Sequence, residues 1–154
     1  MKRTWLIIGT IILAALIIIQ FFQPERNQTK AATDNDIFFQ IETDQLVKKN
    51  IVNACYDCHS NHTRYPFYAN IAPISWMMNK HIVEGKEQLN FSEWGKYDKR
   101  QQLKLIDEIC EVMTTGEMPL KSYTFMHSSA ILNDTEVENI CAWTERAAEE
   151  IFSK

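Results

Sequence analysis

Three residues in the first half of the chain carry the most specific chemistry of this sequence. Cys55 and Cys58 are three positions apart, and His59 follows directly. Two thiols at this spacing can each add to one vinyl group on the same edge of a porphyrin, and the next residue is then held beneath the iron. The pattern predicts a single haem c, attached covalently through Cys55 and Cys58, with His59 as an axial iron ligand.

Two other kinds of site use paired cysteines, and the surrounding sequence favours neither. A redox-active dithiol is typical of a fold with alternating strands and helices, which this sequence does not predict. A structural zinc site needs four ligands, usually from a second Cys/His pair. Cys110 and Cys141 are far apart, each on the apolar face of an expected helix. We interpret them as core residues and leave open whether they pair with each other.

The sixth iron ligand has more than one candidate. We expect Met118, which lies on a loop before Pro119, because a thioether stabilises ferrous iron and a neighbouring proline stiffens the loop. His81 is the alternative axial ligand, since it falls on the apolar face of an expected helix. Met126 and His127 are further candidates. The ordinary alternatives are a methionine that fills apolar space and a histidine satisfied in the core.

Other residues near the motif could orient the haem. Pro66 or Pro73 could turn the chain so that a backbone carbonyl accepts the Nδ1 proton of His59 and fixes its ring. Arg64 and Trp76 could donate hydrogen bonds to the haem propionates. The common alternatives are a solvated arginine and a core tryptophan.

Four helices are predicted to position these residues. Thr43 or Asp44 can cap the first, which ends near Ala54, and Asp98 and Asn133 each begin a capping box for the third and fourth. The third helix stops at Gly116. The second runs from about 73 to 85, with an apolar face at Ile74, Met77, Met78, His81 and Ile82. No segment has a sustained period of two, so the globular part is predicted to be all-α.

The N-terminal segment predicts a membrane anchor. No charged residue occurs from Thr4 to Pro24, and 18 residues from Trp5 to Phe22 span about 27 Å as a helix, close to the hydrocarbon core of a bilayer. The bulky residues at the end of this run argue against a cleaved signal peptide. Lys2 and Arg3 favour a cytoplasmic N-terminus. We expect an anchor over residues 1–24, a polar linker over 25–42, and a domain over 43–154 outside the cytoplasmic membrane.

The charge balance limits the classes of molecule that the domain is expected to bind. The chain has 16 basic and 20 acidic residues, and two of the basic ones precede the apolar run. An acidic domain without a basic cluster is a poor match for nucleic acid. We expect the membrane and a redox protein as partners, the latter docked by complementary charge, and the sequence indicates no small-molecule substrate.

Taken in order, these residues resemble the bacterial haem-binding domain family, which is related to cytochrome c. The resemblance covers about residues 40–150 and rests on the segments 54–61, 71–76, 81–94, 116–119 and 142–143. It implies a covalent haem c, a cytochrome c-like helical fold and a periplasmic position. It implies no substrate. The chain departs from the usual cytochrome c layout by a long insertion after His59, which contains His81.

Electron transfer is the leading functional hypothesis, with no enzymatic activity and no catalytic residues expected. The iron would cycle between ferric and ferrous states, and the protein would set its potential and partner docking. The alternatives are a haem enzyme, such as a small peroxidase, or a haem-based sensor, both of which need an open distal site. A third is a structural or assembly subunit in which haem only stabilises the fold.

Overall fold

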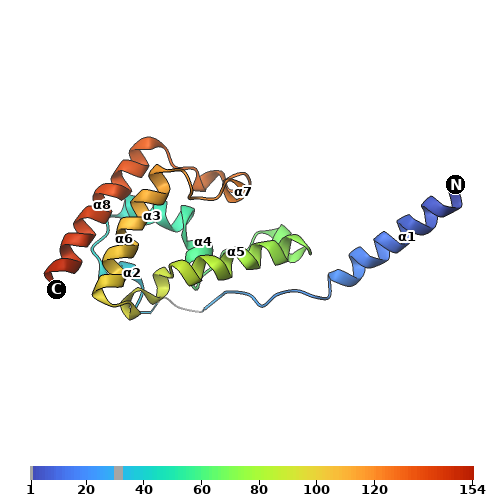
Figure 1. Ribbon diagram of the computed structural model, residues 1–154, viewed down its shortest axis with the longest axis horizontal. Helices are drawn as coiled ribbons and strands as arrows, with labels where there is room; N and C mark the ends of the chain where they lie inside the picture. The colour runs from blue at the N-terminus through green and yellow to red at the C-terminus, as the bar shows by residue number, and fades with distance from the viewer. Residues whose placement is uncertain (1, 30–32) are drawn as a thin grey trace.

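The computed structural model describes residues 2–29 and 33–154, and these ranges fold entirely from helices and loops, apart from an isolated bridge between Gln28 and His62 (Figure 1). The prediction of an all-α fold is confirmed. The longer helices are α1 (Lys2–Ile19), α3 (Gln45–Ala54), α5 (Ile74–Gln88), α6 (Lys99–Thr114) and α8 (Asp134–Ser153). Shorter turns connect them: α2 (Ile37–Gln40), α4 (Tyr56–His59), η1 (Phe67–Asn70), η2 (Phe91–Lys96), α7 (Lys121–Thr124) and η3 (Ser128–Ala130).

Local capping determines where α6 and α8 begin. The Asp98 side chain accepts from the Gln101 backbone N–H at 2.8 Å, and the Gln101 side chain accepts from the Asp98 N–H at 3.0 Å. Asn133 and Glu136 form the same reciprocal pair at the start of α8. Such caps satisfy backbone donors that have no partner inside the helix. Both predicted capping boxes are confirmed.

The core lies where α6 and α8 pack side by side and α3 packs against α8 (Figure 1). Its largest fully buried side chains are Trp94 and Trp143, and the Trp143 indole N–H donates to the Glu42 carbonyl at 3.2 Å. Full burial of such side chains stabilises the fold by about 2–3 kcal/mol each. A disulfide between Cys110 and Cys141, with Cα atoms 4.9 Å apart, joins α6 to α8. The two cysteines are therefore a cross-link between helices.

The expected linker is more ordered than a polar tether. Ile37 and Ile41 are buried in the core, and the nearby Asp36 caps α2 and accepts from the Tyr56 hydroxyl at 2.9 Å. Upstream, the Thr29 N–H donates to the Asn61 carbonyl at 3.0 Å. Residues 30–32 lie outside the described residues. The packed unit thus includes residues before 43, because two isoleucines in this polar segment find apolar neighbours.

Two helices differ from the prediction in extent or packing. α1 ends at Ile19 rather than near Phe22, and it is long and apolar enough to cross a membrane. In α5, Ile82 is buried, but Ile74 and Met77, predicted on its apolar face, are exposed. The first half of α5 packs against η1 at an end of the domain away from α6 and α8 (Figure 1), so no core element covers these side chains.

Candidate functional site

The motif Cys55–His59 folds as a single helical turn at a chain corner. Cys55 ends α3, and its carbonyl accepts from the His59 backbone N–H at 2.9 Å, which closes α4. Residues three and four positions apart lie on one side of a helical turn. The Cys55, Cys58 and His59 side chains therefore line the same cavity.

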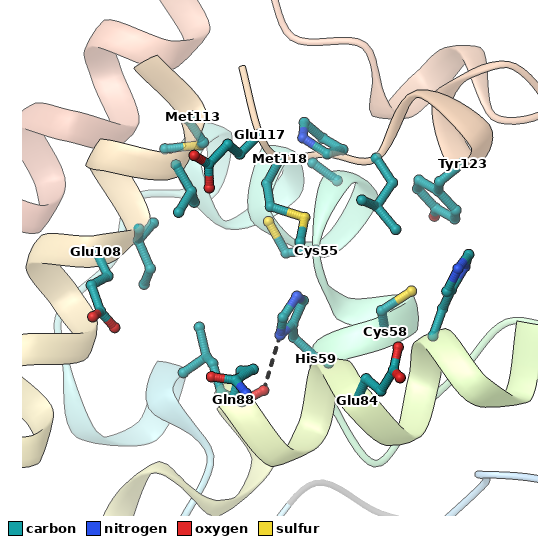
Figure 2. A pocket seen from close by; sticks show the side chains of 18 of the residues that line it. Cys55, Cys58, His59, Glu84, Gln88, Glu108, Met113, Glu117, Met118 and Tyr123 are labelled. Carbon is teal, nitrogen blue, oxygen red and sulfur yellow. Dashed lines mark hydrogen bonds between the residues drawn. The ribbon is translucent and has the colours of Figure 1, made fainter. Parts of the chain in front are cut away.

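This cavity has a volume of about 540 Å³, within the range of pockets that enclose small molecules and cofactors. Its walls are mostly apolar and come from α3, α4, α5, α6 and the chain leading into α7 (Figure 2). The lining residues are Ala54, Cys55, Cys58, His59, His81, Glu84, Gly85, Gln88, Leu89, Phe91, Glu108, Ile109, Val112, Met113, Glu117, Met118, Pro119, Leu120 and Tyr123.

The His59 ring is held in one orientation. Its Nδ1 lies 3.1 Å from the Leu89 carbonyl oxygen, which can only accept, so Nδ1 carries a proton and donates it (Figure 2). Nε2 is then the nitrogen available to a metal. Burial lowers the pKa of His59, which keeps the imidazole neutral, as a metal ligand must be. The expected carbonyl near Pro66 or Pro73 is instead that of Leu89, at the end of α5.

The two motif cysteines are free, protonated thiols. Burial, together with the neighbouring Cys58 thiol, raises the pKa of Cys55 to about 12. Burial and the Asp57 carboxylate raise the pKa of Cys58 to about 11. Reactive dithiols instead have pKa values below that of free cysteine. The pKa values of Cys55 and Cys58 are therefore shifted in the direction opposite to those of a redox-active dithiol.

A buried carboxylate inside the motif anchors the turn. Asp57 is 3% exposed and accepts from the Arg64 backbone N–H at 3.0 Å, the Arg64 Nε at 2.9 Å and the Tyr123 hydroxyl at 2.6 Å. Arg64 thus binds Asp57. The sequence had suggested instead that Arg64 could donate hydrogen bonds to the haem propionates. The roles of Asp57 and Tyr123 were not predicted, although an acidic residue inside the motif and an arginine seven positions later are visible in the sequence.

Close packing of α5 brings a second helix against the motif. A Cβ atom at Gly85 would lie 2.9 Å from the Cys58 carbonyl oxygen, closer than side-chain carbon atoms approach. Glycine therefore allows α5 to contact α4 here. His81 is one turn before Gly85 on the same helix and also lines the cavity.

Met118 enters the cavity from the other side. Gly116 has a φ of 73°, in the left-handed region that favours glycine, and ends α6 as predicted. The Met118 backbone N–H donates to the Val112 carbonyl at 3.0 Å. In Figure 2 the Met118 side chain points into the cavity from the side opposite His59.

The remaining candidates lie elsewhere. Met126 is exposed, and His127 stacks on Tyr123 with ring centroids 4.1 Å apart; neither lines the cavity. The Trp76 indole N–H donates to the Phe22 carbonyl, near the end of α1. Trp76 is therefore directed away from the cavity.

Comparison with known families gives one match. The family model of a haem-binding domain matches residues 14–146, most of the chain. This chain belongs to the haem-binding domain family. Comparisons with curated proteins and with solved structures found no match.

The residues of this haem-binding domain fit a haem. The cavity is apolar, as a porphyrin requires, and it gathers two protonated thiols, a neutral imidazole with a free Nε2 and a thioether. Figure 2 shows all four side chains directed into one space. When bound, haem supplies an iron centre that exchanges one electron. Leu89 orients the imidazole, and the Asp57 network fixes the turn that carries both thiols.

Proposed function

We propose that this protein is a membrane-anchored, monohaem c-type cytochrome that transfers electrons outside the cytoplasmic membrane. The observation that carries the proposal is the convergence of Cys55, Cys58, His59 and Met118 on one apolar cavity. The thiols would hold haem through thioether bonds, and His59 Nε2 would bind the iron. No residue is assigned a catalytic role.

Met118 is proposed as the sixth ligand, because the rival His81 comes from α5, the helix that packs against the motif turn. His81 is four residues before Gly85, whose Cα hydrogens face the Cys58 backbone, and α5 also supplies the carbonyl that orients His59. Met118 comes from the opposite side in Figure 2, where a sixth ligand is needed.

The proposed role is electron transfer, because two protein ligands leave no iron position for a substrate. A thioether opposite an imidazole favours ferrous iron and raises the reduction potential. The acidic surface suits a basic redox partner, docked by complementary charge.

The proposed location rests on α1 and on the disulfide. α1 is long and apolar enough to cross a membrane, and Lys2 and Arg3 at its start favour a cytoplasmic N-terminus. A Cys110–Cys141 disulfide persists in an oxidising compartment, in keeping with a domain outside the cytoplasm.

Covalent attachment is tested by purifying the full chain from a host with working cytochrome c maturation. Thioether bonds survive unfolding, so the denatured protein should keep the mass of one haem and give a c-type pyridine haemochrome spectrum. Protein of unmodified mass from this host would refute the proposal.

The location is tested on intact cells and on isolated membranes. Carbonate washing should leave the protein bound, and protease added to the outer face should remove the haem domain. Recovery of a soluble form that begins after residue 24 would show a cleaved signal peptide instead.

A further inference from the structure

A second uncharged segment follows the haem motif. Residues 65–79 contain no Asp, Glu, Lys or Arg, and apart from residues 4–24 no uncharged run in the chain is longer. Arg64 and Lys80 bound it on either side. The segment comprises η1 and the first turns of α5.

This segment exposes large apolar side chains instead of burying them. Phe67 is 79% exposed and Met77 is 52% exposed. Together with Ile71, Ile74 and Trp76, which are also exposed, they form what we call the interface patch. Single exposed apolar residues are common on soluble domains, but several within eleven consecutive residues are a candidate interaction surface.

The interface patch is joined directly to the end of the expected membrane helix. The Gln20 side chain makes two hydrogen bonds to the backbone of Ala72, donating to its carbonyl at 3.1 Å and accepting from its N–H at 2.9 Å. Figure 1 shows the start of α5 beside the end of α1, with the rest of the domain farther away. If α1 spans a bilayer, the interface patch must lie where the helix leaves it.

We propose that the interface patch is inserted into the polar–apolar boundary of the bilayer and holds the haem domain against the membrane in a fixed orientation. This inference rests on the proposed membrane anchor. Tryptophan and tyrosine favour this boundary because one end of each ring is apolar and the other can hydrogen-bond, and the segment contains Trp76, Tyr65 and Tyr68.

Lipid is a better occupant of the interface patch than a second protein, because the patch is continuous with the apolar surface of α1. The exposed Phe21 and Phe22 extend the apolar surface of α1 up to the patch, and the Trp76 indole donates to the Phe22 carbonyl. A protein partner here would have to pack at the point where α1 enters lipid. α5 then leads from the membrane to the haem cavity, with Leu89 about 22 Å along the helix from Ile74.

Photo-crosslinking of the full-length haem protein in phosphatidylethanolamine–phosphatidylglycerol vesicles tests this inference. A photoreactive benzoylphenylalanine replaces Phe67 in the patch, Phe21 after α1, or Phe152 near the C-terminus. All three side chains are at least 74% exposed, so the substitutions remove little packing. Phe152 lies at the end of α8 far from α1 (Figure 1) and is the matched control.

We expect lipid adducts, measured by mass spectrometry, at Phe67 and Phe21, each several-fold more abundant than at Phe152. Adducts at Phe21 with only the Phe152 level at Phe67 would overturn the inference and leave the anchor intact. No adducts at either Phe21 or Phe67 would overturn both. Adducts at Phe67 but not at Phe21 would overturn the inference as stated, because the patch would then contact lipid without the anchor on which the inference rests. Equal adducts at all three positions would also overturn the inference, because contact would not be confined to this face.

Discussion

The two sides of the candidate haem cavity are built in different ways. The motif side consists of α4 and α5, where Asp57 is buried, His59 is fixed by the Leu89 carbonyl, and Gly85 packs against the Cys58 backbone. The loop side runs from Gly116 to Leu120, where Gly116 and Glu117 are exposed and the next three residues are half-buried. One side is fixed by several buried contacts, and the other largely by one backbone hydrogen bond of Met118 to Val112.

Because the two sides differ in this way, we expect them to have different roles in binding haem. Under the proposed function, a turn that holds two thiols and an imidazole must be rigid, since the thiols would meet vinyl groups at one edge of the porphyrin while the imidazole lies beneath the iron. A loop that supplies only a thioether needs less support, because methionine is flexible and adapts to its surroundings. Changes on the motif side should therefore remove the cofactor, whereas changes on the loop side should alter its properties.

The largest effect is expected from Cys55→Ala combined with Cys58→Ala. Without either thiol no thioether can form, so haem mass in the denatured protein should fall to background. Cys110→Ser combined with Cys141→Ser is the matched control and should keep covalent haem, since this disulfide joins α6 to α8. Equal loss of haem in both double variants would mean that cysteine removal acts through folding rather than attachment.

On the loop side, Met118→Ala should keep the covalent haem but lose the weak far-red absorption of a thioether–iron bond and lower the potential. Met126→Ala is the matched control, because Met126 is exposed and does not line the cavity. His81→Ala tests the rival ligand. Should His81→Ala open the iron while Met118→Ala does not, the motif side would supply both iron ligands, and the two sides would not differ in the proposed way.

Removing the disulfide should lower stability without altering the haem. The bond closes a sequence separation of 31 residues, for which chain entropy gives about 3–4 kcal/mol. We expect Cys110→Ser with Cys141→Ser to lose that amount of unfolding free energy in denaturant titration. An unchanged visible spectrum should accompany the loss. A shifted far-red band would show instead that the disulfide positions the Met118 loop.

The smallest effect is expected where the two sides touch. Tyr123, which follows the Met118 loop, donates to Asp57 of the motif, so Tyr123→Phe should cost about 1.5 kcal/mol. Tyr68→Phe is the control, because the Tyr68 hydroxyl makes a longer contact, 3.3 Å to the His127 Nε2. This change should alter the unfolding free energy by less than about 0.5 kcal/mol. Equal losses in chemical denaturation would show that the Tyr123–Asp57 bond has no special role.

The capping boxes that the sequence predicted correctly are encoded locally. The starts of α6 and α8 follow from residues three positions apart. Contacts between distant residues could not be predicted in this way. Tyr123 and Asp57 are 66 positions apart, and the carbonyl that orients His59 is 30 positions away. Which tyrosine or carbonyl is used depends on how the helices pack.

The errors about α5 and the linker have the same origin. Periodicity placed Ile74 and Met77 on an apolar face, but it does not say what covers that face. In residues 25–42 the overall polarity concealed two isoleucines, Ile37 and Ile41, that pack in the core. Burial is decided by neighbours that are remote in sequence.

The most direct test of the central claim is the optical spectrum of the purified full-length protein in both oxidation states. The claim is that His59 and Met118 occupy opposite sides of one covalently bound haem. We predict a low-spin haem c with a weak far-red band in the oxidised state that vanishes on reduction, and no immediate binding of carbon monoxide by the reduced protein. A high-spin spectrum with immediate carbon monoxide binding would contradict the claim, because it would show an open iron position where Met118 is expected.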